Sequence, residues 1–413
     1  MANKFINSKW AKVFLADAIE EMPYVKASKT YFADSIKGKK VGKTYSFVLR
    51  DSGEVTDDLE IAGGTIRGLT EREVKVTLKS KKNVVGLNVL ESITDIEEFK
   101  TEVADTYGLR LGAEVQKDII EDTIFNASTA FVGDGSNNWK PLSNAIAQLK
   151  DSRVAGNLVG FIPSRLQSDL TVGALQGWSF LPNEQGANFY GNGYVGNFQT
   201  CDFVNVSDIP IVESPTANYS DTGHQIKSIV EGANDTTVIT IENDSGTVAK
   251  PALKKGTVLF IDGLYATNIV GMQTQEPFAC IVQKDVAGTT SAVDQEVIVQ
   301  RIDVGEYGAR NATGTGITEL EDLEGAGISV GLALNKKYYV AQIRQEKALA
   351  YEAPDLDDLV GAENTSVNIG HIKLKTTVLG NGYSMQNISR WDIAYGSVIP
   401  DNRLVALAYI PVN

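Results

Sequence analysis

The residues whose types and spacing could support catalysis or cofactor binding are few, and each lacks part of the pattern that its chemistry needs. Residues 191–196 match the GxGxxG fingerprint of dinucleotide binding. That fingerprint requires a strand before it and a helix after it, so that the pyrophosphate meets a helix N-terminus. Here residues 183–190 are loop-like, and residues 198–206 indicate an extended segment. We therefore predict no nucleotide cofactor.

The candidate metal ligands do not form a set. His224 and His371 are the only two histidines, and neither has a second histidine or a cysteine at ligand spacing. Asp355, Asp357 and Asp358 form an acidic cluster that lacks the glycine and the terminal glutamate of a calcium loop. We therefore predict structural histidines, a solvated acidic turn, no metal site and no catalytic residues.

The composition is that of an ordinary folded chain. The 413 residues are 43% hydrophobic and 22% charged, which allows two or three cores and is unlike a disordered or fibrous protein. No stretch approaches the roughly 18 unbroken apolar residues of a membrane helix, and no signal-like apolar core follows the first residues. Cys201 and Cys280 form no CxxC pair, so neither a disulfide framework nor a thiolate site is indicated. These features favour a reducing cytoplasm.

The charge of the chain limits its contacts with nucleic acid. A net charge of −14 argues against a protein that coats or reads nucleic acid, because neutralising phosphates requires a basic surface. The local exception is the run Lys37, Lys39, Lys40 and Lys43, which could touch a polyanion or an acidic partner. The alternative is a solvated loop.

Residues 8–22 predict an amphipathic helix. Its apolar face would carry Ala11, Leu15, Ala18, Ile19 and Met22. We expect Asp17, Glu20 and Glu21 on the opposite face, where they form either an acidic patch for a basic partner or solvated surface.

A β-hairpin is predicted next, with strands at residues 43–50 and 73–79. Val74, Val76 and Leu78 share one side of the second strand. Because a two-stranded hairpin is poorly stable alone, we expect this side to lean on another element.

The longest predicted helix covers residues 94–127. Thr94 and Glu97 form a capping-box pattern, and apolar residues then recur every three or four positions. Gly108 and Gly112 weaken such a helix by about 1 kcal/mol each relative to alanine. We therefore expect another element to pack closely at these two glycines.

An α/β segment is predicted over residues 141–213. It contains a helix at 142–153, a buried strand at 158–162 that Pro163 stops, and a helix that Ser164 is well placed to cap. Residues 174–200 predict a long loop.

The pattern changes at residues 215–302, where short strands alternate with turn-rich spacers, as is typical of a small barrel or sandwich with its own core. The α/β pattern resumes over residues 318–413, so the β-rich part is interpreted as an insertion.

In this order, the segments resemble the major capsid proteins of tailed bacteriophages with the Hong Kong 97 fold, and more narrowly the P-twenty-two-like coat proteins that carry an insertion domain. The resemblance covers essentially the whole chain. The stretches that carry it are 14–22 with 26–31, 43–90, 94–127, 159–164, 253–263, 331–337 and 395–403.

The resemblance implies an α+β fold with an inserted β-rich, barrel-like domain. It assigns an N-terminal arm to residues 1–42, an E-loop hairpin with flanking strands to 43–90, a spine helix with peripheral domain to 91–140, the first part of an axial domain to 141–214, the insertion to 215–302, and the remaining axial and peripheral parts to 303–413.

The function implied by the resemblance is self-assembly. Hexamers and pentamers would form an icosahedral shell, the virion capsid, in the host cytoplasm with a scaffolding protein and a portal. The shell would enclose double-stranded DNA without sequence-specific binding, and no cofactor, enzyme activity or membrane contact is expected. In this reading Asp17, Glu20 and Glu21 face inward and bind a basic scaffolding segment.

Two alternatives remain open. An encapsulin-like cellular nanocompartment shares the fold, although the inserted β-domain argues against it. An enzyme or carbohydrate-binding module built on residues 215–302 is the second alternative, for which we find no catalytic pair.

Some relatives link a hairpin lysine covalently to an asparagine of a neighbouring subunit. The candidate lysines here are Lys75, Lys79, Lys81 and Lys82. The reaction needs a desolvated lysine beside a carboxylate and a target amide, and the spacing of residues reveals no such group. We therefore expect a shell without covalent links, whose subunits run near 44.6 kDa on a denaturing gel.

Overall fold

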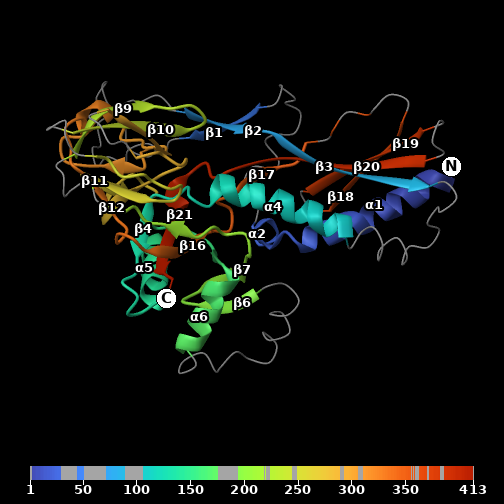
Figure 1. The fold of residues 1–413 in the computed structure, drawn as a ribbon, viewed down its shortest axis with the longest axis horizontal. Coiled ribbons are helices and arrows are strands. Elements are labelled where there is room, and N and C mark those ends of the chain that lie inside the picture. The colour runs from blue at the N-terminus through green and yellow to red at the C-terminus, as the bar shows by residue number, and fades with distance from the viewer. Residues whose placement is uncertain are drawn as a thin grey trace, which may run out of the picture.

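A computed structural model describes residues 2–28, 44–50, 71–88, 106–174, 194–217, 219, 224–243, 249–288, 293–305, 310–354, 356, 358, 362–369, 372–381 and 386–412. These residues form a mixed α+β fold with many strands and few helices. The molecule is elongated, with helix α1 at one end and the strands β9 to β12 at the other (Figure 1). No helix in the described ranges has the length and apolar character needed to cross a membrane.

The central layer is a seven-stranded sheet in the order β4-β21-β16-β5-β7-β6, with β8 also paired to β16. Its strands are Thr129–Val132 (β4), Val405–Pro411 (β21), Lys337–Gln345 (β16), Leu158–Ile162 (β5), Cys201–Asn205 (β7), Tyr194–Phe198 (β6) and Val212–Glu213 (β8). Because successive residues of a strand face opposite sides, β16 and β21 present one apolar set to each face, and both strands are almost wholly buried.

Helices α5 (Trp139–Asp151) and α6 (Ser164–Ala174) supply apolar residues to the same core cluster as one face of this sheet. The predicted helix at 142–153 and strand at 158–162 are confirmed. The predicted cap is wrong, because Ser164 begins the helix itself and its hydroxyl donates to Asn205 Oδ1 at 2.8 Å.

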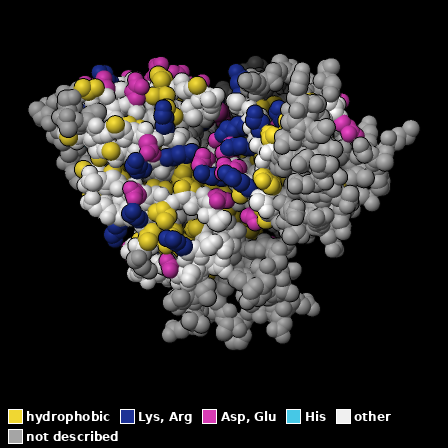
Figure 2. All heavy atoms as spheres, turned by 45° about the vertical axis from the view of Figure 1, so that its right-hand side comes forward, with side chains coloured by type: hydrophobic (Ala, Val, Ile, Leu, Met, Phe, Trp, Pro, Cys, Tyr) yellow, Lys and Arg dark blue, Asp and Glu magenta, His cyan; other side chains and the backbone are white. Residues whose placement is uncertain are grey.

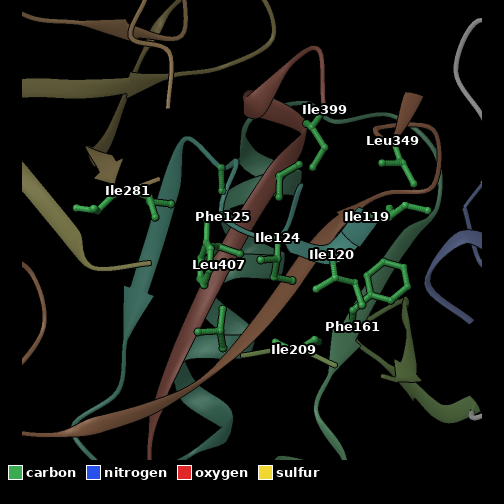
Figure 3. Packing of buried hydrophobic residues seen from close by; sticks show 14 of the residues in the cluster. Ile119, Ile120, Ile124, Phe125, Phe161, Ile209, Ile281, Leu349, Ile399 and Leu407 are labelled. Atoms are coloured by element: carbon green, nitrogen blue, oxygen red, sulfur yellow. The ribbon is translucent and has the colours of Figure 1, made fainter. Parts of the chain in front are cut away.

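Helix α4 (Leu109–Thr123) packs on the other face of the sheet. Figure 3 shows Ile119, Ile120, Ile124 and Phe125 close to Phe161 and Leu407 of the sheet. The predicted helix over 94–127 is too long at its C-terminal end, because the chain leaves the helix after Thr123 to enter β4. Residues 94–105 lie outside the described residues.

Helix α1 (Ala2–Glu20) crosses α4 at the two glycines. A Cβ atom built on Gly112 would lie 2.0 Å from the carbonyl oxygen of Ala18, and one on Gly108 would lie 3.1 Å from that of Phe14. The expected close approach of another element is therefore confirmed. A short helix, α2 (Pro23–Lys26), follows α1 and contacts α4 and β7.

A second sheet has the order β17-β20-β19-β18, with β3 paired to β20. Its strands are Ala350–Glu352 (β17), Gln386–Val398 (β20), Ile372–Asn381 (β19), Glu363–Ile369 (β18) and Lys79–Asn88 (β3). Helix α1 packs against β18 and β19, and the Phe14 ring stacks on Trp391 with centroids 4.7 Å apart.

The predicted hairpin is confirmed as β1 (Thr44–Arg50) paired antiparallel to β2 (Glu71–Thr77). Its buried residues Val74 and Val76 form a small cluster with Ala350, against which Leu78 and Val398 pack. The hairpin therefore leans on β17 and β20, as expected.

The β-rich part of the chain predicted as an insertion forms two sheets, β13-β10-β9 and β12-β11-β14 with β15 paired to β11. The strands are His224–Glu231 (β9), Thr236–Asn243 (β10), Val258–Thr267 (β11), Gln273–Ile281 (β12), Gln295–Gln300 (β13), Ala312–Thr313 (β14) and Ile328–Val330 (β15). Bridges Val282↔Val299 and Gln225↔Gly327 join the two sheets at both edges. The pairing therefore runs in a closed circuit, β9-β10-β13-β12-β11-β15, which we call the ring.

The ring corrects two expectations. It extends to β15, so the boundary predicted at residue 302 is too early, and a segment 215–302 alone would leave the circuit open. The described residues between 318 and 412 hold strands and two 3₁₀ turns, Leu320–Leu323 (η4) and Asn402–Leu404 (η5), but no α-helix. The predicted α/β character of that segment is therefore wrong.

Three glutamine side chains hold the chain that leaves α4. Gln342 of β16 donates to the carbonyls of Thr123 and Ile124, at 3.0 and 3.1 Å. Gln283 and Gln300 of the insertion donate to the carbonyls of Phe125 and Ala127, at 2.9 and 3.0 Å. Backbone carbonyls at the C-terminal end of a helix have no hydrogen-bond donor within the helix. The three glutamines donate to these carbonyls and so connect the end of α4 to β16 and to the two β-rich sheets. We call residues 123–128 the linker.

The crossing of α1 and α4 gives a direct test. Gly112→Ala should lower the free energy of unfolding by about 2 kcal/mol, because the new methyl group meets backbone that cannot move aside, and this outweighs the gain in helix propensity of about 1 kcal/mol. Gly108→Ala is the matched control and should change stability by less than about 1 kcal/mol. Urea unfolding followed by circular dichroism measures both. Equal midpoints for the two variants would contradict the close approach.

Candidate functional site

A buried polar cluster lies where α2, α4, β5 and β16 meet. Its centre is Arg344, whose side chain is 0% exposed. The guanidinium carbon lies 4.1 Å from the centroid of the Tyr24 ring and 4.6 Å from that of Phe161. Among the described residues no carboxylate forms an ion pair with this cation. The two aromatic faces supply the negative electrostatic surface that a buried cation needs.

Hydrogen bonds attach the cation to the N-terminal segment. Arg344 Nη1 donates to Tyr24 Oη at 2.9 Å, and Nη2 donates to the Tyr24 carbonyl at 3.3 Å and to Ser28 Oγ. Burial lowers the pKa of Arg344, an effect that Tyr24 opposes. Burial raises the pKa of Tyr24, against the influence of Arg344, Thr123 and Gln342.

The hydrogen bonds of the Tyr24 hydroxyl follow from those of its neighbours. Both amide hydrogens of Gln342 go to linker carbonyls, so its Oε1 accepts, and Tyr24 Oη donates to it at 2.7 Å. Thr123 Oγ1 donates its one hydrogen to the Ile119 carbonyl at 2.6 Å and lies 2.9 Å from Tyr24 Oη. Tyr24 Oη thus donates to Gln342 and accepts from Arg344. This arrangement positions groups but offers no free nucleophile or base.

A row of ion pairs joins α4 to β3. Lys79 Nζ lies 2.6 Å from Asp122, and Lys81 Nζ lies 3.1 Å from Asp118 and 3.9 Å from Glu114. Figure 2 shows basic and acidic side chains interleaved across the middle of one face. Exposed pairs of this kind contribute little stability each, but they fix how the helix lies along the strand.

Asp118 is the most embedded acid of this row. Burial alone would raise its pKa, but the hydrogen bond from Tyr395 Oη at 2.7 Å and the pairing with Lys81 outweigh burial, so the pKa is lowered. The carboxylate is therefore ionised at neutral pH.

The lysines considered for covalent linking are divided between two elements. Only Lys75 belongs to the hairpin. Lys79, Lys81 and Lys82 lie on β3, which pairs with β20, so their assignment to the hairpin is wrong. Lys79 and Lys81 are engaged by α4.

The acidic face predicted on the N-terminal helix is only partly exposed. Asp17 is 6% exposed, so its placement on the solvent side is wrong. The apolar face of α1 is broader than expected because Phe14 is also buried, and the close crossing with α4 brings Gly108 against Asp17. Glu20 and Glu21 are exposed.

The other candidate residues lie apart. Residues 37–43, with the four lysines, and residues Asp355, Asp357 and His371 lie outside the described residues. Asp358 pairs with the buried Lys375 at 3.0 Å. The end of the GxGxxG match lies in strand β6 (Tyr194–Phe198), where the dinucleotide fingerprint needs a helix. Within the described ranges no group of His, Cys, Asp and Glu is arranged to hold a metal ion.

The two cysteines are buried and free, and burial raises the pKa of both thiols. They are therefore present as thiols rather than reactive thiolates at neutral pH.

Arg344 and Gln342 are not among the residues predicted from the sequence. A signal was present, because residues 337–345 read as an apolar strand in which these two polar residues fall on the same side. Two polar side chains on one buried face of a strand must find partners inside the protein.

Comparison with known proteins gave matches to solved structures only; no family model and no curated protein matches. A capsid of Helicobacter pylori bacteriophage KHP30 is 8% identical, with 94% of this chain and 87% of that chain covered and a TM-score of 0.42. A structure from Mycobacterium phage Che8 is 11% identical, covering 92% and 91%, with a TM-score of 0.41. A virus-like particle from Pyrococcus furiosus is 10% identical, covering 97% and 97%, with a TM-score of 0.37.

The phenol of Tyr24 is the centre of the polar cluster, so its removal should be costly. Tyr24→Phe leaves Gln342 Oε1 and Arg344 Nη1 without this partner, and each buried orphan costs about 1–3 kcal/mol. We expect a loss of about 3 kcal/mol in the free energy of unfolding, measured by urea denaturation. Tyr339→Phe, on the opposite face of β16, is the control and should cost less than about 1 kcal/mol. A small effect of Tyr24→Phe would contradict the role of this hydroxyl as the hydrogen-bond partner of Gln342 and Arg344.

Proposed function

We propose that this chain is the major capsid protein of a tailed bacteriophage and that it assembles into an icosahedral shell around double-stranded DNA. The observation that carries the proposal is the hairpin β1–β2, whose strands, among the described residues, pair with each other alone and pack on the body through the small cluster of Val74, Val76 and Ala350. An isolated two-stranded sheet is marginally stable in water, so a neighbouring subunit is the natural support for it.

The body of the molecule suits a shell subunit in three ways. An elongated sheet and α1 lie at one end, the ring lies at the other, and α4 runs between them (Figure 1). The order of these parts follows the resemblance described above, with spine helix, axial sheet and insertion. The acidic net charge would keep the inner wall from gripping DNA that must enter and leave.

The partners follow from the same proposal. Hexamers and pentamers of the chain would form the shell, a portal would occupy one vertex, and a scaffolding protein would guide assembly in the host cytoplasm. Shell growth needs many modest interfaces, because misplaced subunits must be able to dissociate.

An encapsulin-like nanocompartment is the second candidate. The ring supports the phage candidate over this one, since an inserted β-domain is the feature that the resemblance assigns to the coat-protein branch. DNA inside particles purified from infected cells would favour the phage shell, and particles filled with protein cargo would favour the nanocompartment.

The test of assembly is negative-stain microscopy of the expressed chain, alone and with the product of the neighbouring reading frame. We expect closed shells of uniform size in the second sample. Boiled particles should run as a single band near 44.6 kDa, because no covalent link is expected. A monomer that never forms shells under either condition would overturn the proposal, and a ladder that survives reductant would overturn the absence of links.

The scaffolding contact is now proposed for Glu20 and Glu21 alone. The double variant Glu20→Lys/Glu21→Lys should fold normally, because both side chains are exposed, but should give aberrant shells in the co-expression experiment. Lys12→Glu, also exposed on α1, is the control and should leave particle size unchanged. Normal yield and size from the double variant would rule the contact out.

A further inference from the structure

The ring contains a buried histidine. His224 is 1% exposed, and among the described residues neither of its ring nitrogens has a hydrogen-bond partner of normal geometry. It begins β9, opposite Asn243 of β10, and its ring lies edge-on to Tyr219 at a centroid distance of 5.4 Å. Burying an imidazole without a hydrogen bond is costly, and burying an imidazolium without one costs far more.

A second basic group is buried near this histidine. Lys250 is 3% exposed, and its Nζ donates to the carbonyl of Val293 at 2.7 Å. No carboxylate in the described part of the chain forms an ion pair with it. A proton on His224 would therefore add a positive charge to a region that already holds one.

The remaining polar group near the histidine is already saturated. Tyr219, 0% exposed, donates from Oη to Gln295 Oε1 at 2.5 Å. Gln295 Nε2 in turn donates to the carbonyls of Pro251 and Ala287, both at 2.9 Å. This network closes the end of the ring, and it offers the imidazolium no free acceptor.

The charged groups on the elements packed around His224 are on the outside. Lys227 of β9 pairs with Asp294 at 2.8 Å and lies 3.9 Å from Glu242 of β10. Turn η4 packs on β9 and carries exposed acids. The exposed carboxylates on or next to β9, β13 and η4 are Glu231, Glu296, Glu319, Glu321, Asp322 and Glu324. Burial and Lys250 lower the pKa of His224, while the backbone of Glu242 opposes them.

We propose that His224 is an acid-sensitive switch that holds the ring closed when neutral and opens it when protonated. The group that must be neutral for the closed state is buried beside Lys250. In the open state the imidazole meets water and binds its proton with its ordinary pKa of 6.5. Opening therefore takes up a proton.

The direction of the pH effect follows from this linkage. The closed ring binds fewer protons than the open ring, so closure is fully favoured above pH 6.5 and weakens as the pH falls below it. For one proton the opening equilibrium shifts by up to about tenfold for each pH unit below that value. The inference concerns the single subunit and does not depend on shell assembly.

Hydrogen exchange of the ring strands between pH 7.5 and pH 5, corrected for the intrinsic exchange rate, measures the switch. The chain has only two histidines, so the other one supplies a matched control. We expect opening to rise about tenfold from pH 6 to pH 5 in the unmodified chain and in His371→Gln. His224→Phe keeps the aromatic contact with Tyr219 and should lose this pH dependence.

A second variant covers the case in which His224→Phe does not fold. Lys250→Met removes the neighbouring cation, which lowers the pKa of His224 in the closed ring, and keeps the apolar stem, so opening should depend less steeply on pH. Opening that is independent of pH in the unmodified chain, or that persists equally in His224→Phe, overturns the proposal. Loss of the effect in His371→Gln instead would assign the switch to the other histidine and also overturn it.

Discussion

The fold depends on a buried cation that is held by aromatic rings and a phenol rather than by a carboxylate. Arg344 is fully buried and has no ion-pair partner among the described residues, so Tyr24, Phe161 and Ser28 supply the contacts that stabilise its charge. Two of these three residues, Tyr24 and Ser28, belong to the first 28 residues of the chain. The N-terminal segment is therefore part of the core, because without it Arg344 would be a buried and unsolvated charge.

The same phenol connects three parts of the sequence that are far apart. Tyr24 reaches Thr123 and Gln342, residues 99 and 318 positions away along the chain. Gln342 in turn donates to carbonyls of the linker, and Gln283 and Gln300 donate to other linker carbonyls from the side of the ring. The N-terminal segment, the central sheet, α4 and the ring thus share one continuous set of hydrogen bonds and one apolar cluster.

Local patterns predicted local structure well. Gly108 and Gly112 predicted a close helix crossing, because glycine destabilises a helix and is favoured there only where another element packs against the backbone. The predicted boundary at residue 302 left out β15 because this strand has only three residues, too few to show a period. The acidic side chain of Asp17 predicts exposure. Asp17 is buried because α1 and α4 approach each other closely beside it.

The contacts between the parts of the fold differ in how they respond to salt and to pH. The α4–β3 contact consists of exposed ion pairs, which salt screens over about 8–10 Å. The linker is held by neutral amides, whose hydrogen bonds carry no net charge to screen or titrate. The ring is closed by backbone pairing around a histidine that must stay neutral. Salt therefore weakens the contact between α4 and β3, and acid opens the ring. The linker, which lies between these two parts, keeps its geometry under both conditions.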